Sequence, residues 1–323
     1  MHLVFSKEIR AAAAAALRKA RQDAPYETRD SLSLSMLDDF GRVAKSNRKQ
    51  SRADLREAFP DEISTANLAA LATGALGFSL ISSTHEQDAD RVEILPPQFI
   101  AESERPDPNH LIGSHLTAIS NKTLAIVNLV ESGFEMAARP LIRTLQEFCC
   151  LSLIIASDQE KARDHFAAQK TEEEKKVFYK HFSPRKLNRA VSDLEERVGF
   201  SDGAFEKHRA EVHSYYTTSV HATFGFGSLS GYVSSVREDD WVAYALFGRA
   251  STGSRNTLFM ASVTAWHYLE LLKLVVTEVH GYQIPTHNDL MASGFGFADA
   301  LGKSLQILLR TRQDRTSSVL NSA

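Results

Sequence analysis

Four charged residues on one stripe of an otherwise apolar segment are the first candidates for chemistry in this sequence. Glu135, Arg139, Arg143 and Glu147 follow one another at intervals of four within the stretch 134–157. At helical spacing, such residues lie one above another on a single face. Charges on so apolar a helix must be paired or face a cleft, because burying a lone charge is costly. The stripe therefore indicates either two ion pairs on a partly solvated face or a functional cleft.

A second stripe lies on the stretch 202–223. Arg209, His213, Thr217 and His221 are again four residues apart and share one helical face. Histidine can carry protons near neutral pH, and arginine can hold a phosphate group through parallel N–H bonds. The alternative is that each histidine is partly buried and satisfied by ordinary hydrogen bonds.

Together the two stripes supply the catalytic candidates, which are Arg143, Glu147, Arg209, His213 and His221. We hypothesise that Arg143 and Glu147 meet His221 across two packed helices. In that arrangement Glu147 would orient or protonate His221, and Arg143 would remain available for an anion.

A group of basic residues nearer the N-terminus is a candidate for binding nucleic acid. It consists of Arg42, Lys45, Lys49, Arg52 and Arg56. On one unbroken helix these side chains would share about a quarter of the circumference and could follow a phosphate backbone. However, Ser46-Asn47 and a helix-capping Ser51 indicate a break between helices over 31–46 and 51–58. The sequence therefore favours a solvated charged face at this position.

Two short motifs resemble those of an uncharacterised bacterial domain-of-unknown-function family of helical bundles, with the pattern L-x-R-S-L-x-E followed by S-x-x-V-H. The matching stretches run from Leu141 to Glu147 and from Thr217 to His221. Thr144 and Thr217 stand where the family more often has serine. The resemblance covers roughly 115–280 and leaves 1–110 unmatched. It implies a helical bundle and no established activity.

A looser likeness is to the HEPN helical nucleases, which cleave RNA without a metal and carry R-x(4–6)-H on one helix. Arg209 and His213 share a face, but they stand one residue closer together than that pattern requires. Arg105 and His110 have the required spacing, but they lie in a proline-rich stretch. This likeness would imply a metal-independent ribonuclease, in a toxin or phage-defence setting.

No metal or cofactor site is expected. The sequence has no P-loop, no H-E-x-x-H motif and no Rossmann glycine fingerprint after a strand. His267 and Glu270 could offer two metal ligands, but a di-iron bundle needs matching pairs, which are absent. The two cysteines, Cys149 and Cys150, are adjacent, which would strain a disulfide and suits a reducing compartment.

Composition and hydropathy predict a cytoplasmic protein. The net charge of −3 gives no global case for binding nucleic acid or an anionic membrane. We expect no signal peptide and no membrane span, because the apolar run 68–81 has about fourteen residues against roughly twenty needed to cross a bilayer. Gly74 and Gly77 would let this run pack closely on another helix. We therefore expect a homodimer, with a protein partner or RNA as further binding candidates.

Helical periodicity dominates the chain and predicts an all-α protein, a multi-helix antiparallel bundle with an N-terminal helical unit. Its expected parts are the N-terminal unit (1–83), a proline-rich linker (84–112), the main bundle (113–281), and a C-terminal helix and tail (282–323). Within them we expect a turn at Gly133, a helix over 241–250 and a short strand candidate at 92–95.

The function that best fits these features is that of a non-enzymatic helical module that binds a partner chain or itself. The alternative is a metal-independent ribonuclease or phosphate-handling enzyme of HEPN-like type. A third candidate is a small-ligand sensor with a cleft between helices. An open pocket at Arg143, Glu147 and His221 would favour a site, and a closed core there would favour a structural module.

Overall fold

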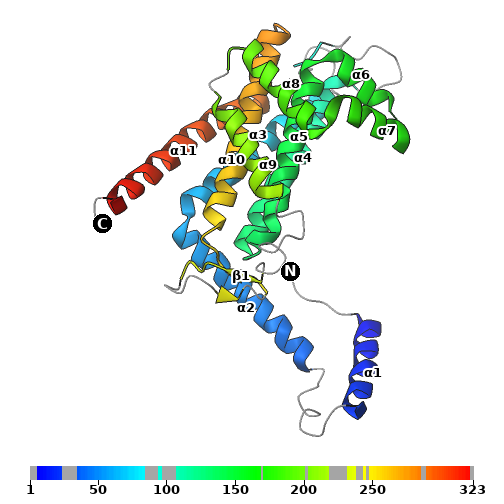
Figure 1. Cartoon of the computed structure of the whole chain (residues 1–323), viewed down its shortest axis with the longest axis vertical. Helices are drawn as coiled ribbons and strands as arrows, with labels where there is room; N and C mark the ends of the chain where they lie inside the picture. The colour runs from blue at the N-terminus through cyan, green and yellow to red at the C-terminus, as the bar shows by residue number, and fades with distance from the viewer. Residues whose placement is uncertain are drawn as a thin grey trace.

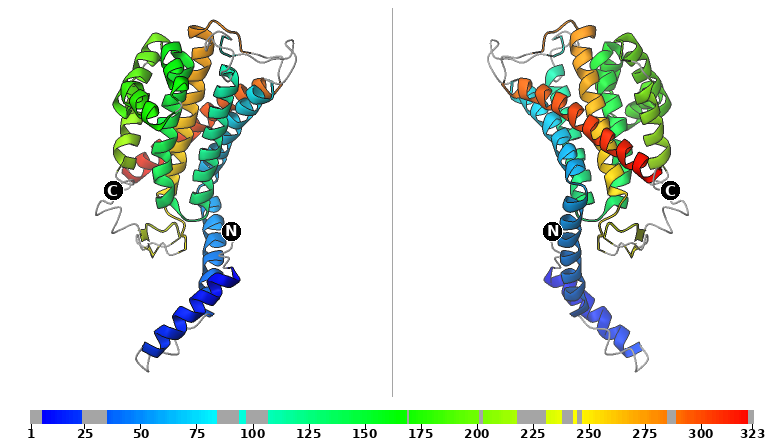
Figure 2. Two further views of the ribbon diagram at one scale, coloured as in Figure 1. Left: turned by 90° about the vertical axis from the view of Figure 1, so that its right-hand side faces the viewer. Right: turned by 90° about the vertical axis from the view of Figure 1, so that its left-hand side faces the viewer.

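The computed structural model describes residues 6–23, 35–83, 94–96, 107–168, 170–200, 203–217, 231–237, 243–244, 247–284 and 289–320. These residues are almost wholly helical, which confirms the predicted all-α, multi-helix bundle (Figure 1). The bundle consists of α3 (Pro60–Ser83), α4 (Pro108–Glu131), α5 (Glu135–Ser157), α8 (Pro184–Arg197), α9 (Ala204–Thr217), α10 (Ser254–Leu274) and α11 (Asp289–Leu320). The helix α1 (Lys7–Asp23) and much of α2 (Ser35–Ala58) extend away from it (Figure 2).

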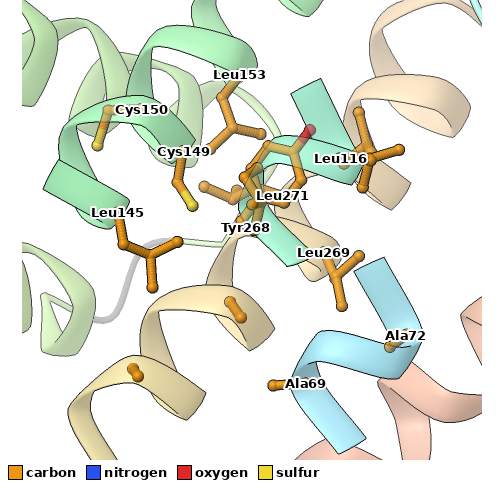
Figure 3. Packing of buried hydrophobic residues seen from close by; sticks show 14 of the residues in the cluster. Ala69, Ala72, Leu116, Leu145, Cys149, Cys150, Leu153, Tyr268, Leu269 and Leu271 are labelled. Atoms are coloured by element: carbon orange, nitrogen blue, oxygen red, sulfur yellow. The ribbon is translucent and has the colours of Figure 1, made fainter. Parts of the chain in front are cut away.

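One hydrophobic core joins the helices of the bundle. Leu145 and Cys149 of α5, Tyr268 of α10 and Leu116 of α4 all belong to it (Figure 3). Leu145, Tyr268 and Leu116 are completely buried. The apolar residues of α5 wrap around most of the helix, and this pattern places α5 in the interior with α4, α8, α9 and α10 packed around it.

The helix α3 contributes to this same core, although the sequence analysis placed it in a separate N-terminal unit. Ala69 and Ala72 are buried in the shared core. Gly77 lies directly against α4: a Cβ atom on Gly77 would stand 2.8 Å from the carbonyl oxygen of Gly113. The small residues of α3 therefore serve contacts within the chain and give no argument for a second copy. The homodimer remains a prediction.

Three stretches are long and apolar enough to cross a bilayer, judged by length and composition alone: Pro60–Ser82, Glu135–Ser157 and Ser254–Val279. The last comprises α10 and the π-helix η5 (Val275–Val279). Between 56% and 72% of the most apolar part of each stretch is buried inside the chain. Packing in the core therefore accounts for most of their apolar character. A cytoplasmic location without membrane contact remains a prediction.

The predicted break within α2 was wrong, because this helix runs unbroken from Ser35 to Ala58. Ser51, which we expected to cap a new helix, is only 2% exposed. It lies beside Gly133, where a Cβ atom would stand 2.8 Å from its Oγ atom. Packing of the middle of α2 against the turn between α4 and α5 therefore overrides the weak helix propensity of the segment.

The helix predicted over 241–250 is also absent from the residues described there. Ala243–Tyr244 forms β2, which pairs antiparallel with Tyr232–Val233 as β1. Phe247 and Gly248 have φ angles of 58° and 98°, which no right-handed helix accepts. Aromatic and β-branched residues are frequent in this stretch and favour extended backbone.

The strand candidate at 92–95 is not a strand in its described part. Ile94 and Leu95 both donate their backbone N–H groups to Oδ1 of Asn109, at 2.7 and 2.9 Å. Asn109 belongs to the first turn of α4, which Asp107 caps by accepting the Asn109 N–H at 2.7 Å. The main bundle therefore begins inside the segment that we expected to be a linker.

The turn predicted at Gly133 is confirmed. Its φ angle is +82°, a conformation that glycine adopts at little cost. A Cβ atom at this position would also stand 2.2 Å from the backbone nitrogen of Arg249. The short turn makes α4 and α5 antiparallel neighbours and fixes where the charged stripe of α5 begins.

Candidate functional site

The charged stripe of α5 forms the two ion pairs that its spacing predicts. Arg139 Nε donates to Glu135 Oε1 at 2.7 Å, and Arg143 Nε donates to Glu147 Oε1 at 2.8 Å. The buried Glu135 also accepts a hydrogen bond from Thr257 Oγ1 of α10 at 2.6 Å. The first pair therefore ties α5 to α10, and the second lies nearer to solvent, with Glu147 39% exposed.

Three of the predicted catalytic residues do come together. Arg143, Glu147 and His213 line one cavity between α5, α8 and α9, together with Gln146, Cys150, Pro184, Leu187 and Asn188. This cavity has a volume of about 10 Å³, which is the space that a single water molecule needs. It leaves no room for a phosphodiester or any other substrate group. His221, the partner proposed for Arg143 and Glu147, lies outside the described residues.

Arg209 lies elsewhere, in a buried ionic network between α8, α9 and α10. It is only 2% exposed. Its guanidinium group holds both carboxylate oxygens of Glu195, one of them at 2.9 Å, and donates to Ser192 Oγ at 2.8 Å. Glu195 in turn contacts Nε2 of His267 at 2.6 Å. Phe205 stacks on the His267 ring with centroids 4.1 Å apart.

Burial and hydrogen bonding shift the pKa values of the ionisable groups in and beside this network. Burial alone would raise the pKa of Glu195, but the hydrogen bonds from His267 and Arg209 hold it below its usual value. Burial lowers the pKa of His267, against the influence of Glu195. The neighbouring His208, which bonds Thr264 Oγ1 at 3.0 Å, has its pKa lowered to about 3 by burial and by the charges of His267 and Arg209. A carboxylate held charged in a closed core is a structural anchor, because no reacting molecule can reach it.

The sequence analysis did not find Glu195, and it considered His267 only as a metal ligand. Glu195 is the one charged side chain that the apolar stripe of α8 carries inward beside Leu194. Its partners lie 14 and 72 positions away in the chain, so helical spacing alone could not connect them.

A much larger pocket adjoins the small cavity between α5, α8 and α9, with which it shares Glu147, Pro184 and Leu187. It lies beneath an arm that leaves the bundle after α5 and comprises α6 (Gln159–Ala167), α7 (Thr171–Val177) and the π-helix η3 (Phe178–Phe182). We call it the arm pocket; its volume is about 570 Å³. Its walls are Thr144, Glu147, Phe148, Leu151, His165, Phe166, Ala168, Glu174, Val177, Phe178, Phe182, Pro184 and Leu187.

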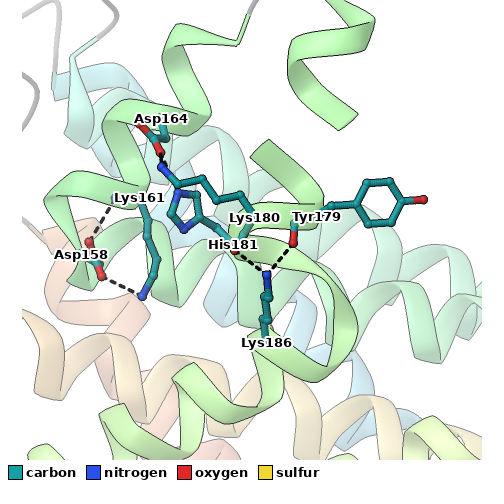
Figure 4. Close-up of polar contacts among 7 residues, drawn as sticks. All are labelled: Asp158, Lys161, Asp164, Tyr179, Lys180, His181 and Lys186. Carbon is teal, nitrogen blue, oxygen red and sulfur yellow. Dashed lines mark hydrogen bonds and ion pairs between the residues drawn. The ribbon is translucent and has the colours of Figure 1, made fainter. Parts of the chain in front are cut away.

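Polar contacts among α6, η3 and α8 hold the arm in place (Figure 4). Asp164 accepts hydrogen bonds at 2.7 Å from Lys180 Nζ and from Nε2 of His181. Lys186 Nζ donates to the carbonyl oxygens of Tyr179 and Lys180 at 2.7 and 2.9 Å. By contrast, α7 has no buried residue. These contacts therefore tie α6 to η3 and η3 to α8, and the exposed helix α7 lies between α6 and η3 in the chain.

A third hollow lies at the opposite end of α5, where α2 crosses the turn between α4 and α5. Lys45, Arg48, Lys49 and Arg52 of α2 line it, with Asn128, Leu129, Ser132 and Phe134 on the other side. We call it the basic groove; its volume is about 540 Å³. Three of the five residues predicted to bind nucleic acid thus share one groove, and Arg42 and Arg56 lie beyond its two ends on the same helix.

Among the described residues, no three His, Cys, Asp or Glu side chains are placed to hold a metal ion. Comparisons of the chain with protein-family models, with curated proteins and with solved structures gave no match in any of the three. The resemblance to the helical-bundle family and the likeness to the HEPN nucleases therefore remain predictions.

Proposed function

We propose that this protein is a helical binding module that takes up a small apolar molecule with a positive charge in the arm pocket. The single observation that carries the proposal is the pocket itself. Its volume of about 570 Å³ lies within the range of about 300–1,000 Å³ that is typical of small-molecule sites. Most of its walls are apolar, as such sites require.

The aromatic walls favour a cation. Four phenylalanines, Phe148, Phe166, Phe178 and Phe182, contribute to the lining. The face of an aromatic ring attracts a cation, and the attraction grows where water is excluded. Lys122, which does not line the pocket, already lies 5.5 Å from the centre of the Phe148 ring. The ligand contacts that we expect are therefore Phe166, Phe178 and Phe182, of which Phe166 and Phe182 also pack against the His165 ring.

The charged side chains in the walls of the pocket also favour a cation. Glu147 and Glu174 line the pocket, and none of the described residues in its walls is a lysine or an arginine. Arg143 pairs with Glu147 from outside, and Glu174 has no ion pair within the described part of the chain. Burial lowers the pKa of His165, so this histidine is neutral at pH 7 and adds no positive charge.

The ribonuclease alternative has weaker support. It needs Arg143 and His213 to reach a phosphodiester, but the cavity between them holds about 10 Å³, and Arg209 is committed to Glu195. RNA cleavage by the purified chain that disappears in His213→Ala would replace our proposal.

The test compares two probes of the same size and shape, tetraphenylphosphonium and tetraphenylborate, which carry opposite charges. We expect calorimetric titration to detect binding of the cation and weaker or no binding of the anion. Phe178→Ala should weaken cation binding roughly tenfold, since it removes one aromatic wall. The matched control is Tyr179→Ala on the same turn, because Tyr179 is 68% exposed and does not line the pocket.

The charge requirement has its own pair of variants. Glu174→Gln should weaken binding of the cation, whereas Glu173→Gln, one residue earlier and outside the pocket, should not. Equal losses in the two variants would show that only the overall charge matters. Equal affinity for the two probes would contradict the proposed ligand class but not the pocket.

A further inference from the structure

The basic groove shares no lining residue with the arm pocket. Only some of the basic side chains in and beside it are paired with a carboxylate. Glu131, 5% exposed, contacts Arg56 Nε at 2.6 Å and Arg52 Nε at 3.6 Å. Arg42 pairs with Asp39. Lys45 and Lys49 are exposed and have no ion pair within the part of the chain that the structure describes. These two lysines therefore present positive charge to the groove that no carboxylate of the described residues pairs with.

The opposite wall of the groove offers neutral contacts. Asn128 and Ser132 carry an amide and a hydroxyl group that can donate hydrogen bonds to phosphate or sugar oxygens. Phe134 adds an aromatic ring, and the Arg48 guanidinium lies 5.7 Å from the centre of that ring. Cationic side chains combined with an aromatic surface are typical of sites for single-stranded nucleic acid.

The length of the basic row distinguishes a strand from a single nucleotide. Because α2 is continuous, the positions from Arg42 to Arg56 follow one helix axis over about 21 Å, at a rise of about 1.5 Å per residue. This distance exceeds the span of one nucleotide and suits several successive phosphates. We propose that the basic groove binds the sugar–phosphate backbone of a single-stranded nucleic acid, with Lys45 and Lys49 as its main phosphate contacts.

The test measures fluorescence anisotropy of a labelled single-stranded RNA of about twelve nucleotides, a length within the usual range of site sizes. We expect the wild-type chain to bind it at low salt and to lose affinity as salt is raised, because phosphate contacts release counterions. Lys45→Glu combined with Lys49→Glu should weaken binding roughly tenfold or more and flatten the salt dependence.

A matched control keeps the same change in net charge at a distant place. Lys175→Glu combined with Lys176→Glu alters two exposed lysines of α7 and should leave RNA affinity close to that of the wild type. Both double variants change exposed side chains, and their thermal midpoints verify folding. Inorganic phosphate, ATP and anionic lipid vesicles serve as competitors that distinguish a strand from other phosphate carriers.

Three outcomes would overturn the inference. The first is no binding of the RNA at low salt. The second is an equal loss of affinity in both double variants, which would show attraction to overall charge only. The third is displacement of the RNA by equimolar ATP or by vesicles, because the groove would then be a nucleotide or membrane site.

Discussion

Replacing Glu195 by alanine is expected to destabilise the chain by about 3–5 kcal/mol, the cost of breaking a buried ion pair by removing one partner. Arg209 would remain in the core with its guanidinium group uncompensated, and His267 would lose its 2.6 Å contact. These partners come from α9 and α10, so the variant weakens the contact of three helices at once.

Chemical denaturation followed by circular dichroism measures this effect as a lower midpoint. The matched control is Glu196→Ala, which removes the same side chain from the exposed next position of α8 and should change the midpoint little. If Glu195→Ala and Glu196→Ala unfolded at the same denaturant concentration as the wild type, the network would not be a structural anchor.

Leu145→Ala is expected to lower the free energy of unfolding by about 2–5 kcal/mol, because it leaves a cavity among side chains that cannot fully close around it. Leu145 is completely buried at the centre of the core, where α5 meets α10 (Figure 3). Leu124→Ala on α4 makes the same deletion at a position that is 40% exposed, and its cost should be much smaller. A smaller loss for Leu145→Ala than for Leu124→Ala would show that α5 is not the central helix.

Local patterns in the sequence were sufficient to predict much of the fold. Helical periodicity identifies α5 as central, and Gly133 marks its start because the turn requires a positive φ angle. The predictions failed where tertiary contacts decide the outcome. Ser51 resembles a helix cap, but burial against the turn between α4 and α5 keeps α2 continuous. Residues 243–244 pair with a strand that has no recognisable pattern of its own.

The same division applies to the candidate sites. The pair of Arg143 and Glu147 is predictable because its members are one helical turn apart. Glu195 is not, because its contact with Arg209 depends on how α8 and α9 pack. The arm pocket is the extreme case, because its aromatic walls come from three different elements, α5, α6 and η3. Phe166 and Phe178 reach the same pocket only through the packing of α6 and η3, which helical spacing within one element does not predict.

The most direct test of the proposed function is a crystal structure of the chain grown with tetraphenylphosphonium. We predict that the cation lies in the arm pocket, with its aromatic shell against Phe166, Phe178 and Phe182 and with Glu174 as the nearest carboxylate. Density for the cation at another place, or an arm pocket that remains without the cation at concentrations that saturate binding in solution, would contradict the proposal.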